Sequence, residues 1–574
     1  MKPHIISEIE SSGYRLPVYA KTRAPEIGLA QLRRVPVIVA GGGLTGLAFA
    51  VDLASRGLRC IVLDEDDTVG VRGASSRGIA YARKTLEILQ RLGAAAPVLA
   101  KGVTWSVGKT LDLHGELFRI DLASGSCSTQ PAFVNIQQFY VEAALVDRAY
   151  ELGVDIRWKN EVRTMEIVDG ASRLSVSTPD GDYQIEAQWL VDATGVNSPL
   201  RKPAGIGIRT EKGVDRWCIC DVRFETQWPC ERWTWARAPF NGGRAVWQHP
   251  LPDEVWRLDY QLPDDDSDSI DDARARAMVA AHVGPHAKFD IVWAGPWTYR
   301  NQLADCFRRG PVFLVGDAAH AFSPFGGRGG NSGVQDAENL AWKLALVHAG
   351  HAPDSLLDTY DSERRAAAVM NIDITSKTMQ FLKPATAAHR MLRNVLLALA
   401  RHFPRMRRFV NTGKLSVAFD YPLSQAVSHG GHSLPDMLVH TTRGEALLLS
   451  ELAAGPIAGL VLDFCNDPAR ASALRESLGS AFPSLRYCHV SDTPGHDHGD
   501  NKGGYCARIL NDAALREAAL MPPDGDAALL LRPDGHACAL AIGEARHEIT
   551  FAVRAMLCMR DVTNADNKTQ ERSE

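Results

Sequence analysis

The chain has 574 residues, of which 45% are hydrophobic and 23% are charged, and its formal net charge is −5. This composition is ordinary for a globular protein of several domains, and the slight acidic balance argues against a nucleic-acid-binding protein. The eleven cysteines form no Cys-x-x-Cys pair, so we expect neither a disulfide framework nor a metal site. The sequence contains no run of about 18 apolar residues and no apolar signal core near its start. We therefore expect a cytoplasmic protein with no membrane span.

A first glycine-rich turn follows an apolar run at 35–40, which has the pattern of a buried parallel strand. Gly41, Gly43 and Gly46 have the Gly-x-Gly-x-x-Gly spacing of a dinucleotide site. The first glycine permits a tight turn, the second lets the backbone approach a pyrophosphate, and the third lets the next helix pack on the strand.

The elements after this turn complete the dinucleotide pattern. A predicted helix opens with Leu44 and Thr45 and directs its N-terminal amides at the phosphate. The next predicted strand ends at Asp64 and Glu65, about 20 residues further on, where a carboxylate binds the adenosine ribose. Strand, turn, helix, strand and acid occur in this order, so we predict a dinucleotide site rather than an empty glycine turn.

Two side chains outside this motif are candidates for the same cofactor. Arg77 lies in a polar loop before a predicted helix at 84–92, where an arginine can pair with phosphate. A solvated loop charge explains Arg77 equally well. Gln138 lies in a predicted helix at 135–150, and a surface glutamine is its simpler interpretation.

A second glycine-rich stretch begins at Gly316 and Asp317, directly after a short apolar strand at 312–315. The Asp317 carboxylate can accept hydrogen bonds from the sugar-alcohol chain of a flavin. We expect a helix from about Val334, whose positive end would stabilise negative charge on a reduced flavin. The segment between can lie against a flat ring, and its candidate contacts are Pro324, Gly327, Gly329, Gly330 and Asn331.

The fold class expected from these patterns is α/β, with several domains. Tryptophans crowd the sequence after about residue 214, where alternation predicts an antiparallel sheet. Two further helices with solvated, arginine-rich faces are expected at 352–410, and His496-Asp497-His498 has the glycine-rich surroundings of a loop rather than a metal site. The expected domains are an N-terminal extension (1–33), a first domain (34–213 and 300–410), an inserted β-sheet domain (214–299), a C-terminal α/β domain (411–562) and a disordered tail (563–574).

Taken together, the motifs resemble those of the single-component FAD-dependent aromatic hydroxylases, which have the p-hydroxybenzoate hydroxylase fold. The chain is similar to the larger branch with a thioredoxin-like C-terminal domain, such as phenol hydroxylase and 3-(3-hydroxyphenyl)propionate hydroxylase. The resemblance implies a Rossmann-like FAD-binding domain, an inserted antiparallel β-sheet substrate domain and a C-terminal thioredoxin-like domain. The segments that carry it are Gly41-x-Gly43-x-x-Gly46, Gly316-Asp317-Ala318-Ala319-His320 with Pro324, and residues 335–344.

This resemblance also implies a cofactor and a reaction. It favours FAD contacts at Asp64, Arg77, Gln138 and Asp317, and so raises Arg77 and Gln138 above their solvated interpretations. It implies a monooxygenase of aromatic catabolism that hydroxylates a phenolic compound. NADPH or NADH and O2 would be the co-substrates, and a C4a-hydroperoxyflavin would be the oxidising species.

Three positions depart from the family pattern. Thr194 stands where the family usually has aspartate in an Asp-Gly pair, which bears on nicotinamide use rather than on FAD binding. Arg328 and Gly330 replace the usual glutamine and methionine of the loop beside the ring, so Arg328 can place a positive charge near the flavin or an anionic substrate.

No sequence motif identifies the catalytic residues as directly as the glycine motifs identify the cofactor site. A phenol titrates near pH ~10, so a base or a positive group beside it is useful. His249 and Tyr260, on the aromatic strands, are the candidates, although a single histidine on a strand is more often structural.

Three other functions stay open. The same chemistry supports hydroxylation or Baeyer–Villiger oxidation of a polycyclic polyketide. A flavin halogenase is suggested by Trp233 and Trp235, but the motif has one residue too many. The third is a flavin-binding partner protein without turnover. A homodimer is compatible with all of these functions.

Overall fold

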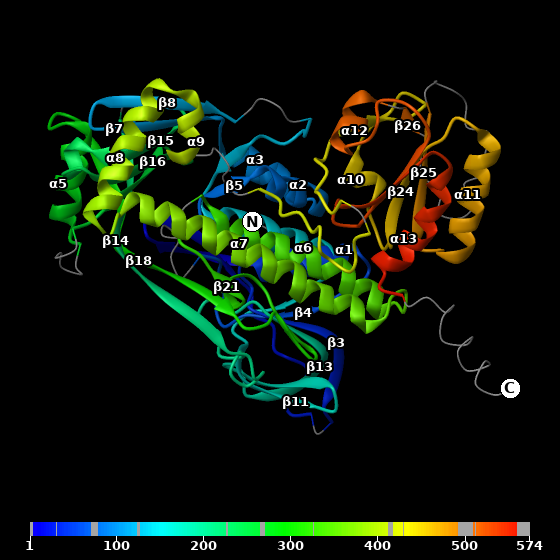
Figure 1. Ribbon diagram of the computed structural model, residues 1–574. Coiled ribbons are helices and arrows are strands. Elements are labelled where there is room, and N and C mark those ends of the chain that lie inside the picture. The colour runs from blue at the N-terminus through cyan, green and yellow to red at the C-terminus, as the bar shows by residue number, and fades with distance from the viewer. Residues whose placement is uncertain are drawn as a thin grey trace.

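The computed structural model describes residues 4–29, 31–70, 78–122, 127–225, 228–263, 270–324, 326–410, 417–428, 430–491, 509–510 and 512–559. Arg77, His496 to His498 and the C-terminal tail lie outside these residues. A sheet-rich body lies at one end of the molecule and a small α/β body at the other, and the long helix α7 (Asp358–Leu382) runs between them (Figure 1).

An eight-stranded mixed sheet carries the first glycine turn. Its strands are β3 (Arg33–Ala40), β4 (Ile61–Leu63), β10 (Asp155–Arg157), β11 (Glu161–Val168), β12 (Ala171–Ser177), β13 (Tyr183–Asp192), β19 (Arg308–Arg309) and β20 (Val312–Leu314). The order is β10-β4-β3-β13-β12-β11, with β20 beside β13 and β19 beside β20. β10, β4, β3, β13 and β20 run parallel, and Ala40, Leu63, Asp192 and Leu314 are register partners. The turns that follow these four residues therefore meet at one edge of the sheet.

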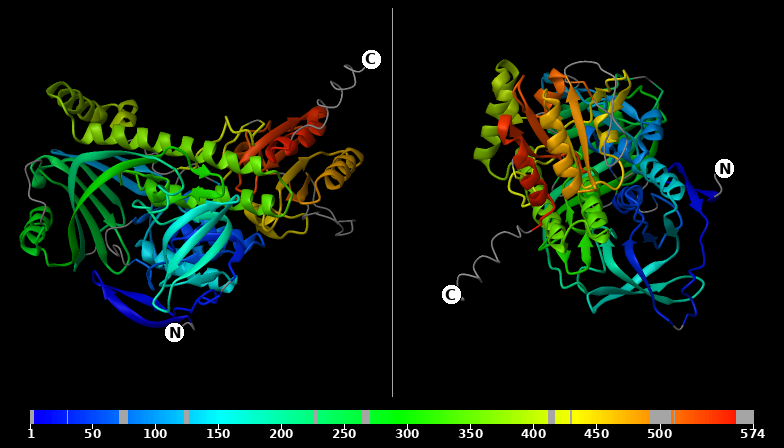
Figure 2. Two further views of the ribbon diagram at one scale, coloured as in Figure 1. Left: turned by 90° about the horizontal axis from the view of Figure 1, so that it is seen from below. Right: turned by 90° about the vertical axis from the view of Figure 1, so that its right-hand side faces the viewer.

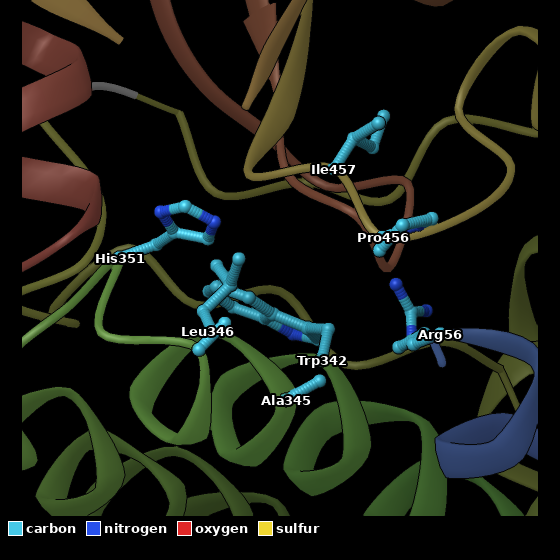
Figure 3. A pocket seen from close by; sticks show the side chains of 8 residues that line it. Arg56, Trp342, Ala345, Leu346, His351, Pro456 and Ile457 are labelled. Atoms are coloured by element: carbon cyan, nitrogen blue, oxygen red, sulfur yellow. The ribbon is translucent and has the colours of Figure 1, made fainter. Parts of the chain in front are cut away.

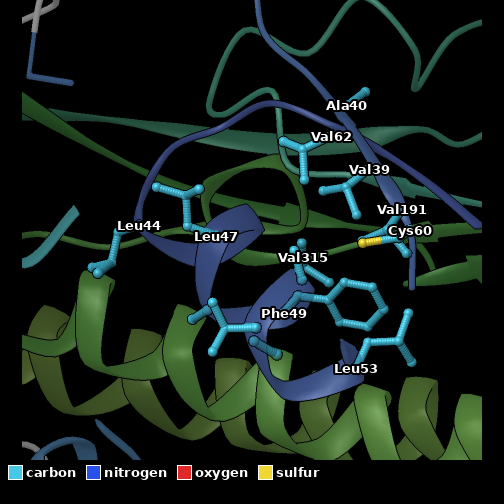
Figure 4. Packing of buried hydrophobic residues seen from close by; sticks show 14 of the residues in the cluster. Val39, Ala40, Leu44, Leu47, Phe49, Leu53, Cys60, Val62, Val191 and Val315 are labelled. Carbon is cyan, nitrogen blue, oxygen red and sulfur yellow. The ribbon is translucent and has the colours of Figure 1, made fainter. Parts of the chain in front are cut away.

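Helix α1 (Leu44–Ser55) lies between this sheet and helix α6 (Arg328–His348). The space is filled by apolar side chains from all three elements, and full burial of each large one contributes about 1.5–3 kcal/mol. Those labelled in Figure 4 include Val39, Leu44, Leu47, Phe49, Leu53, Val62, Val191 and Val315.

Smaller elements complete this part of the molecule. They are helices α2 (Arg83–Leu92), α3 (Ala95–Lys101) and α4 (Gln138–Glu151), and a three-stranded sheet of β5 (Ala80–Ala82), β9 (Phe133–Asn135) and β6 (Val103–Trp105). The N-terminal residues form a hairpin of β1 (Ile5–Ser11) and β2 (Tyr14–Tyr19). This hairpin packs on the first sheet, where Tyr19 stacks on Trp158 at 4.7 Å between ring centroids.

A second eight-stranded sheet forms the body at the opposite end from the small α/β body. Its strands are β7 (Val107–Asp112), β8 (Gly115–Asp121), β14 (Ile208–Phe224), β15 (Arg232–Ala238), β16 (Arg244–Pro250), β17 (Val255–Gln261), β18 (Phe289–Ala304) and β21 (His320–Ala321), in the order β21-β18-β14-β17-β16-β15-β7-β8. The tryptophan-rich segment is thus antiparallel, as its alternation predicts, with β14 paired to β17 rather than to the next strand β15. The sheet also takes β7 and β8 from the preceding part of the chain, and β21 directly after the second glycine stretch.

The two faces of this second sheet are covered differently. Helix α5 (Asp272–Val283) packs on one face, the outer face, through Ala275 and Val279. The C-terminal end of α7 packs on the other, the inner face, where Leu382 joins Trp217 and Trp247. Helices α8 (Ala387–His402) and α9 (Pro404–Val410) follow α7, and α8 packs against β8. Three α-helices rather than the expected two therefore lie between Asp358 and Val410.

The C-terminal body begins with a hairpin of β22 (Leu438–His440) and β23 (Ala446–Leu448). Its main sheet has the order β26-β25-β24-β27-β28, with β24 to β26 parallel and β27 and β28 antiparallel. The elements are α10 (Leu449–Leu452), β24 (Gly459–Phe464), α11 (Pro468–Ala481), β25 (Leu485–Ser491), β26 (Ile509–Leu510), α12 (Ala513–Ala518), β27 (Ala527–Leu531), β28 (Ala537–Ile542) and α13 (Ile549–Met556).

Buried charges join this body to α6 and α7, and we call them the junction cluster: Lys343, Glu363, Arg532 and Asp534. Glu363 of α7 accepts from Arg532 at 2.7 Å and from Lys343 at 2.8 Å. Arg532 also binds Asp534 at 2.5 Å, and Asp534 accepts from the indole of Trp342 at 3.2 Å. Each charge faces an opposite charge. Burial raises the pKa of Glu363, but the Arg532 guanidinium and the Lys343 ammonium outweigh it and hold that pKa well below its usual range.

No helix in the described residues is long and apolar enough to cross a membrane. The two views in Figure 2 show α7 lying along the sheet-rich body and reaching the C-terminal body, with α8 and α9 at the far end.

Candidate flavin site

The first glycine turn has the steric demands of a dinucleotide cradle. Gly41 has φ +105°, and a Cβ there would lie 2.5 Å from the Ala193 carbonyl oxygen. A Cβ on Gly46 would lie 2.0 Å from the Gly41 carbonyl oxygen. At Gly43, by contrast, the nearest described atom to such a Cβ is 3.8 Å away, on Glu142. The protein itself therefore requires glycine at the two outer positions, and the middle position leaves space for a ligand to approach the backbone.

The predicted ribose acid lies beside this turn. Asp64 accepts from the Gly42 amide at 2.5 Å and from the Asp66 amide at 2.9 Å, so its carboxylate is fixed against the cradle. Glu65 is half-buried in the bend that follows.

The two glycine stretches meet at Thr45. A Cβ on Gly316 would lie 2.6 Å from the Thr45 hydroxyl, and one on Gly333 would lie 2.3 Å from it. A Cβ on Gly330 would lie 3.1 Å from Leu44. Residues almost 300 positions apart in sequence thus form one surface, which is the arrangement that two sides of a single cofactor site require.

Glu142 of α4, which the sequence patterns did not single out, places its carboxylate at the start of α1. Glu142 accepts from the Leu44 amide at 3.1 Å and from the side-chain amide of Gln138 at 2.7 Å. Gln138 is therefore connected to the cradle through a helical neighbour four residues later. The i, i+4 spacing from Gln138 to Glu142 was the available signal, since both then lie on one face of α4.

The turn at Gly316 is held from behind by a second buried group that the sequence did not single out. Asp336 accepts from the Gly316 amide at 3.0 Å, from His320 at 2.7 Å and from Arg364 at 2.6 Å. Arg364 continues to the Tyr421 hydroxyl at 2.9 Å. Asp317 lies at the surface of this turn, half-buried, while its neighbours Gly316 and Ala318 are buried.

Helix α6 begins at Arg328, six residues before the expected start at Val334, because Gly327 (φ +62°) serves as its N-cap. Gly329 and Gly330 therefore belong to its first turn, and no described atom lies within 4 Å of a Cβ built on Gly329. The first-turn amides of a helix attract negative charge. The loop expected to lie against a ring is thus mainly a helix N-terminus.

Three other predicted residues have different surroundings. Asn331 donates to Ala80 at 2.8 Å and accepts from Thr85 at 2.6 Å, so its side chain ties α6 to β5 and α2 rather than facing a ligand. Arg328 is buried and donates to Asn371 of α7 at 2.8 Å. Pro324 is exposed before the start of α6.

Thr194 belongs to a small network at the end of β13. Its hydroxyl donates to Asp192 at 2.6 Å, and Ser198 donates to the other oxygen of Asp192. Arg201 then donates to the Ala318 carbonyl at 3.0 Å, next to Asp317. The middle motif is therefore connected to the flavin turn, and threonine here supports Asp192 rather than adding a carboxylate.

His249 and Tyr260 lie on opposite faces of the second sheet. Tyr260 pairs with Val246 on the outer face, and its hydroxyl is 3.0 Å from Nδ1 of His282 in α5. His249 pairs with Arg257 on the inner face. The inner face leads towards the start of α6, because Asn301 of β18, on the same face as Trp297, accepts from the Ser323 amide at 3.1 Å and donates to Ser376 of α7 at 3.3 Å. His249 is therefore on the side of the sheet that leads to the glycine stretches, and Tyr260 is not.

The inner face carries a group of buried and half-buried charges, which we call the inner-face cluster: Asp221, Arg232, His249, Arg257 and Asp259. Arg257 binds Asp221 at 2.8 and 3.1 Å. His249 Nε2 lies 3.8 Å from the Asp259 carboxylate, too far for a hydrogen bond. Within the described residues, His249 Nδ1 and Asp259 Oδ1 are buried without a hydrogen-bond partner.

Burial dominates the titration of these groups. It raises the pKa of Asp259 to about 7, against the attraction of Arg257. It lowers the pKa of Arg232 to about 10, and together with the nearby guanidinium groups it lowers the pKa of His249 well below its usual range. His249 is therefore a neutral acceptor at neutral pH. Arg232 lies 5.7 Å from the ring centroid of Trp247, which in turn is 5.2 Å from that of Trp217.

Neither a metal cluster nor a large cavity competes with this interpretation. The described residues contain no group of three or more His, Cys, Asp or Glu side chains that could hold a metal ion. A cavity of about 60 Å³ lies between α6 and the C-terminal body, lined by residues such as Arg56, Trp342 and His351 (Figure 3). This volume is below the several hundred Å³ of ligand sites. Arg56 also follows the far end of α1, about 18 Å along the helix from Leu44.

Comparison with known proteins agrees with this geometry. A family model described as an FAD binding domain matches residues 34–375. Anhydrotetracycline monooxygenase of Streptomyces rimosus is 28% identical over 530 residues, covering 89% of this chain and 96% of that protein. A 3-(3-hydroxy-phenyl)propionate/3-hydroxycinnamic acid hydroxylase of Mycolicibacterium smegmatis is 26% identical over 547 residues, covering 92% and 94%. The solved OxyS anhydrotetracycline hydroxylase from Streptomyces rimosus has a TM-score of 0.67 at 26% identity, covering 91% of this chain and 99% of that one.

Proposed function

Since the chain belongs to the FAD binding domain family, we propose that this FAD-dependent monooxygenase hydroxylates a phenolic ring with NADPH or NADH and O2. The observation that carries the proposal is the inner-face cluster, whose unsatisfied polar atoms lie on the sheet face that leads into the flavin turn. Bound FAD would supply the oxygen-activating chemistry that no side chain can provide.

The two glycine stretches would hold that cofactor. Gly43 leaves the cradle open for the pyrophosphate, and Asp64 is positioned for the ribose. Asp317 would accept hydrogen bonds from the sugar-alcohol chain, and the first turn of α6 would stabilise negative charge near the ring. Arg77 remains a candidate phosphate partner from its sequence position.

The inner-face cluster would bind and polarise the phenol. Neutral His249 would offer Nδ1 as a hydrogen-bond acceptor for the phenolic hydroxyl, and Asp259, whose pKa burial raises to about 7, lies beside Nε2 of the same ring. Arg232 would attract the developing phenolate oxygen. The indoles of Trp217 and Trp247 provide flat apolar surface for an aromatic ring and exclude water from the charges.

A polycyclic phenol of the polyketide type is the second candidate substrate. The observation that favours it is the 28% identity to anhydrotetracycline monooxygenase over nearly the whole of both chains. The inner-face cluster acts in the same way on either substrate, so the two candidates differ in ring number rather than in mechanism.

The experiment is NADH and NADPH oxidation by the FAD-loaded protein with monocyclic phenols, phenolic acids and polycyclic phenols, followed by mass analysis of the product. We expect ligand-stimulated oxidation and a product with one added oxygen atom. His249→Gln should lower turnover about 10²-fold or more, whereas Tyr260→Phe, on the outer face, should retain it. Equal loss in both variants would contradict the assignment of the inner face.

A further inference from the structure

The segment from residue 374 to residue 419 has an unusual charge. It contains nine lysines and arginines and neither aspartate nor glutamate, within a chain whose net charge is −5. Most of this segment forms the end of α7 and the helices α8 and α9. The described part of this segment, from the end of α7 to α9, therefore carries basic side chains and no acidic ones.

Helix α8 also has two apolar faces, of which the protein covers one. Leu397 and Ala400 are buried against Leu117 and Phe118 of β8. On the uncovered side, Met391 is 70% exposed, Leu392 56% and Val395 45%, and Phe403 after the helix is 56% exposed. Met391, Leu392 and Val395 are at helical spacing and so lie on one side of α8.

The arginines beside this apolar side keep their charge for a ligand. Arg401 donates to the His114 carbonyl at 3.2 Å, and Arg407 donates to the Ala400 carbonyl at 3.3 Å, contacts that satisfy hydrogen bonds without neutralising charge. Arg393 donates to the Leu382 carbonyl at 3.1 Å. Lys377 and Lys383 of the same segment lie beside the carboxylates of Asp373 and Asp215, whereas Arg390 and Arg405 are exposed and form no ion pair among the described residues.

We propose that the surface of α8 and α9 binds an anionic lipid bilayer. Exposed large apolar side chains flanked by arginines are the pattern of an interfacial helix, in which the apolar side enters the headgroup region and the guanidinium groups meet lipid phosphates. A second copy of this surface would bring like charges together, which disfavours self-association here. An acidic protein partner would use the charges, but it would not require this row of separate protruding apolar side chains. Aromatic substrates of low polarity concentrate in the same bilayer region, so the surface would also place the enzyme near its substrate.

The test is co-sedimentation of the full-length, FAD-loaded protein with lipid vesicles. One set of vesicles contains phosphatidylcholine alone, and the other contains phosphatidylcholine with about 30% phosphatidylglycerol, which supplies the negative charge. We expect binding only to the anionic vesicles, weakened by 0.5 M salt, which is roughly five times the ionic strength at which the screening length is 10 Å. The double variant Arg390→Gln/Arg405→Gln should bind about tenfold more weakly. The triple variant Met391→Ser/Leu392→Ser/Val395→Ser should lose binding while it keeps FAD and its melting temperature.

A matched control changes an exposed arginine and an exposed isoleucine on β11, Arg163→Gln/Ile167→Ser, which should bind as the parent does. Two outcomes would overturn the proposal. One is failure of the parent protein to sediment with anionic vesicles. The other is binding of a soluble polyglutamate peptide that competes fully with the vesicles and is unaffected by the serine variant, which would assign the surface to an acidic protein.

Discussion

The junction cluster and the inner-face cluster are both buried groups of charge, but they differ in how completely their polar atoms are paired. In the junction cluster, Glu363 binds Arg532 and Lys343, and Arg532 also binds Asp534. In the inner-face cluster, Arg257 and Asp221 form a similar pair. Among the described residues, however, polar atoms of His249 and Asp259 there have no partner. A buried charge that is fully paired holds a structure together, whereas a buried polar atom without a partner is costly unless a ligand supplies one.

The largest expected effect comes from breaking the paired cluster. Arg532→Ala leaves Glu363 and Asp534 buried with less compensation, and we expect a loss of about 3–5 kcal/mol in the free energy of unfolding. Urea denaturation measures this loss. Arg470→Ala, which removes a half-exposed ion pair with Asp526, should cost less than about 1 kcal/mol. A loss as small for Arg532→Ala would show that the junction cluster does not hold the C-terminal body.

Truncating an arginine of the inner-face cluster should have the opposite consequence, since we expect stability to be kept and turnover to be lost. Arg232→Ala removes a desolvated cation, so we expect the stability to stay within about 1 kcal/mol of the parent or to rise. Turnover of the phenolic substrate should fall about 10²-fold, because the phenolate loses its positive partner. Denaturation and steady-state kinetics on one preparation separate the two effects. A large loss of stability without a change in kcat/KM would remove Arg232 from the proposed substrate site.

Asp317 belongs to neither cluster and tests the cofactor site alone. Asp317→Ala should lower FAD affinity about tenfold to a hundredfold, the usual effect of losing a charge-assisted hydrogen bond. Because Asp317 is at the surface of its turn, the flavin-free protein should keep its stability. Flavin fluorescence titration and the melting temperature are the two measurements. Full FAD occupancy in the variant would contradict the role given to the second glycine stretch.

The smallest effect concerns pH. Burial raises the pKa of Asp259 to about 7, so between about pH 4 and 7 the folded protein retains a proton that the unfolded chain has released. Stability should therefore fall as the pH rises through this window and level off above it. We expect a contribution of about 2 kcal/mol between pH 5 and 7, which Asp259→Asn should abolish. Urea unfolding curves of the parent protein and of Asp259→Asn, recorded at pH 5 and at pH 7, measure this contribution.

Local motifs made the fold and the cradle accessible from the sequence. Gly41, Gly43, Gly46 and Asp64 lie within one βαβ unit, so their spacing alone predicts their arrangement. The family assignment that these motifs implied is confirmed by the match over residues 34–375. The individual cofactor contacts stay predictions.

Long-range pairings could not be predicted in the same way. His249 and Tyr260 both lie on aromatic strands, and only the register of β16 with β17 separates them onto opposite faces. β7 joins the second sheet by pairing with β15 from more than 100 residues later. Glu363 and Arg532 are 169 positions apart, and no local pattern connects them.

Helix α7 has a consequence for how this protein can change over evolutionary time. The match to the family model ends at residue 375, inside a helix that continues to Leu382. Near its start this helix carries Glu363 and Arg364, which bind the C-terminal body, and its last turns pack on the second sheet. A recombination event that exchanged the C-terminal body alone would deprive both residues of their partners. The unit that is inherited together therefore includes α6 and α7 as well as the C-terminal body, because Glu363 also binds Lys343 of α6 and Arg364 also binds Asp336 of α6.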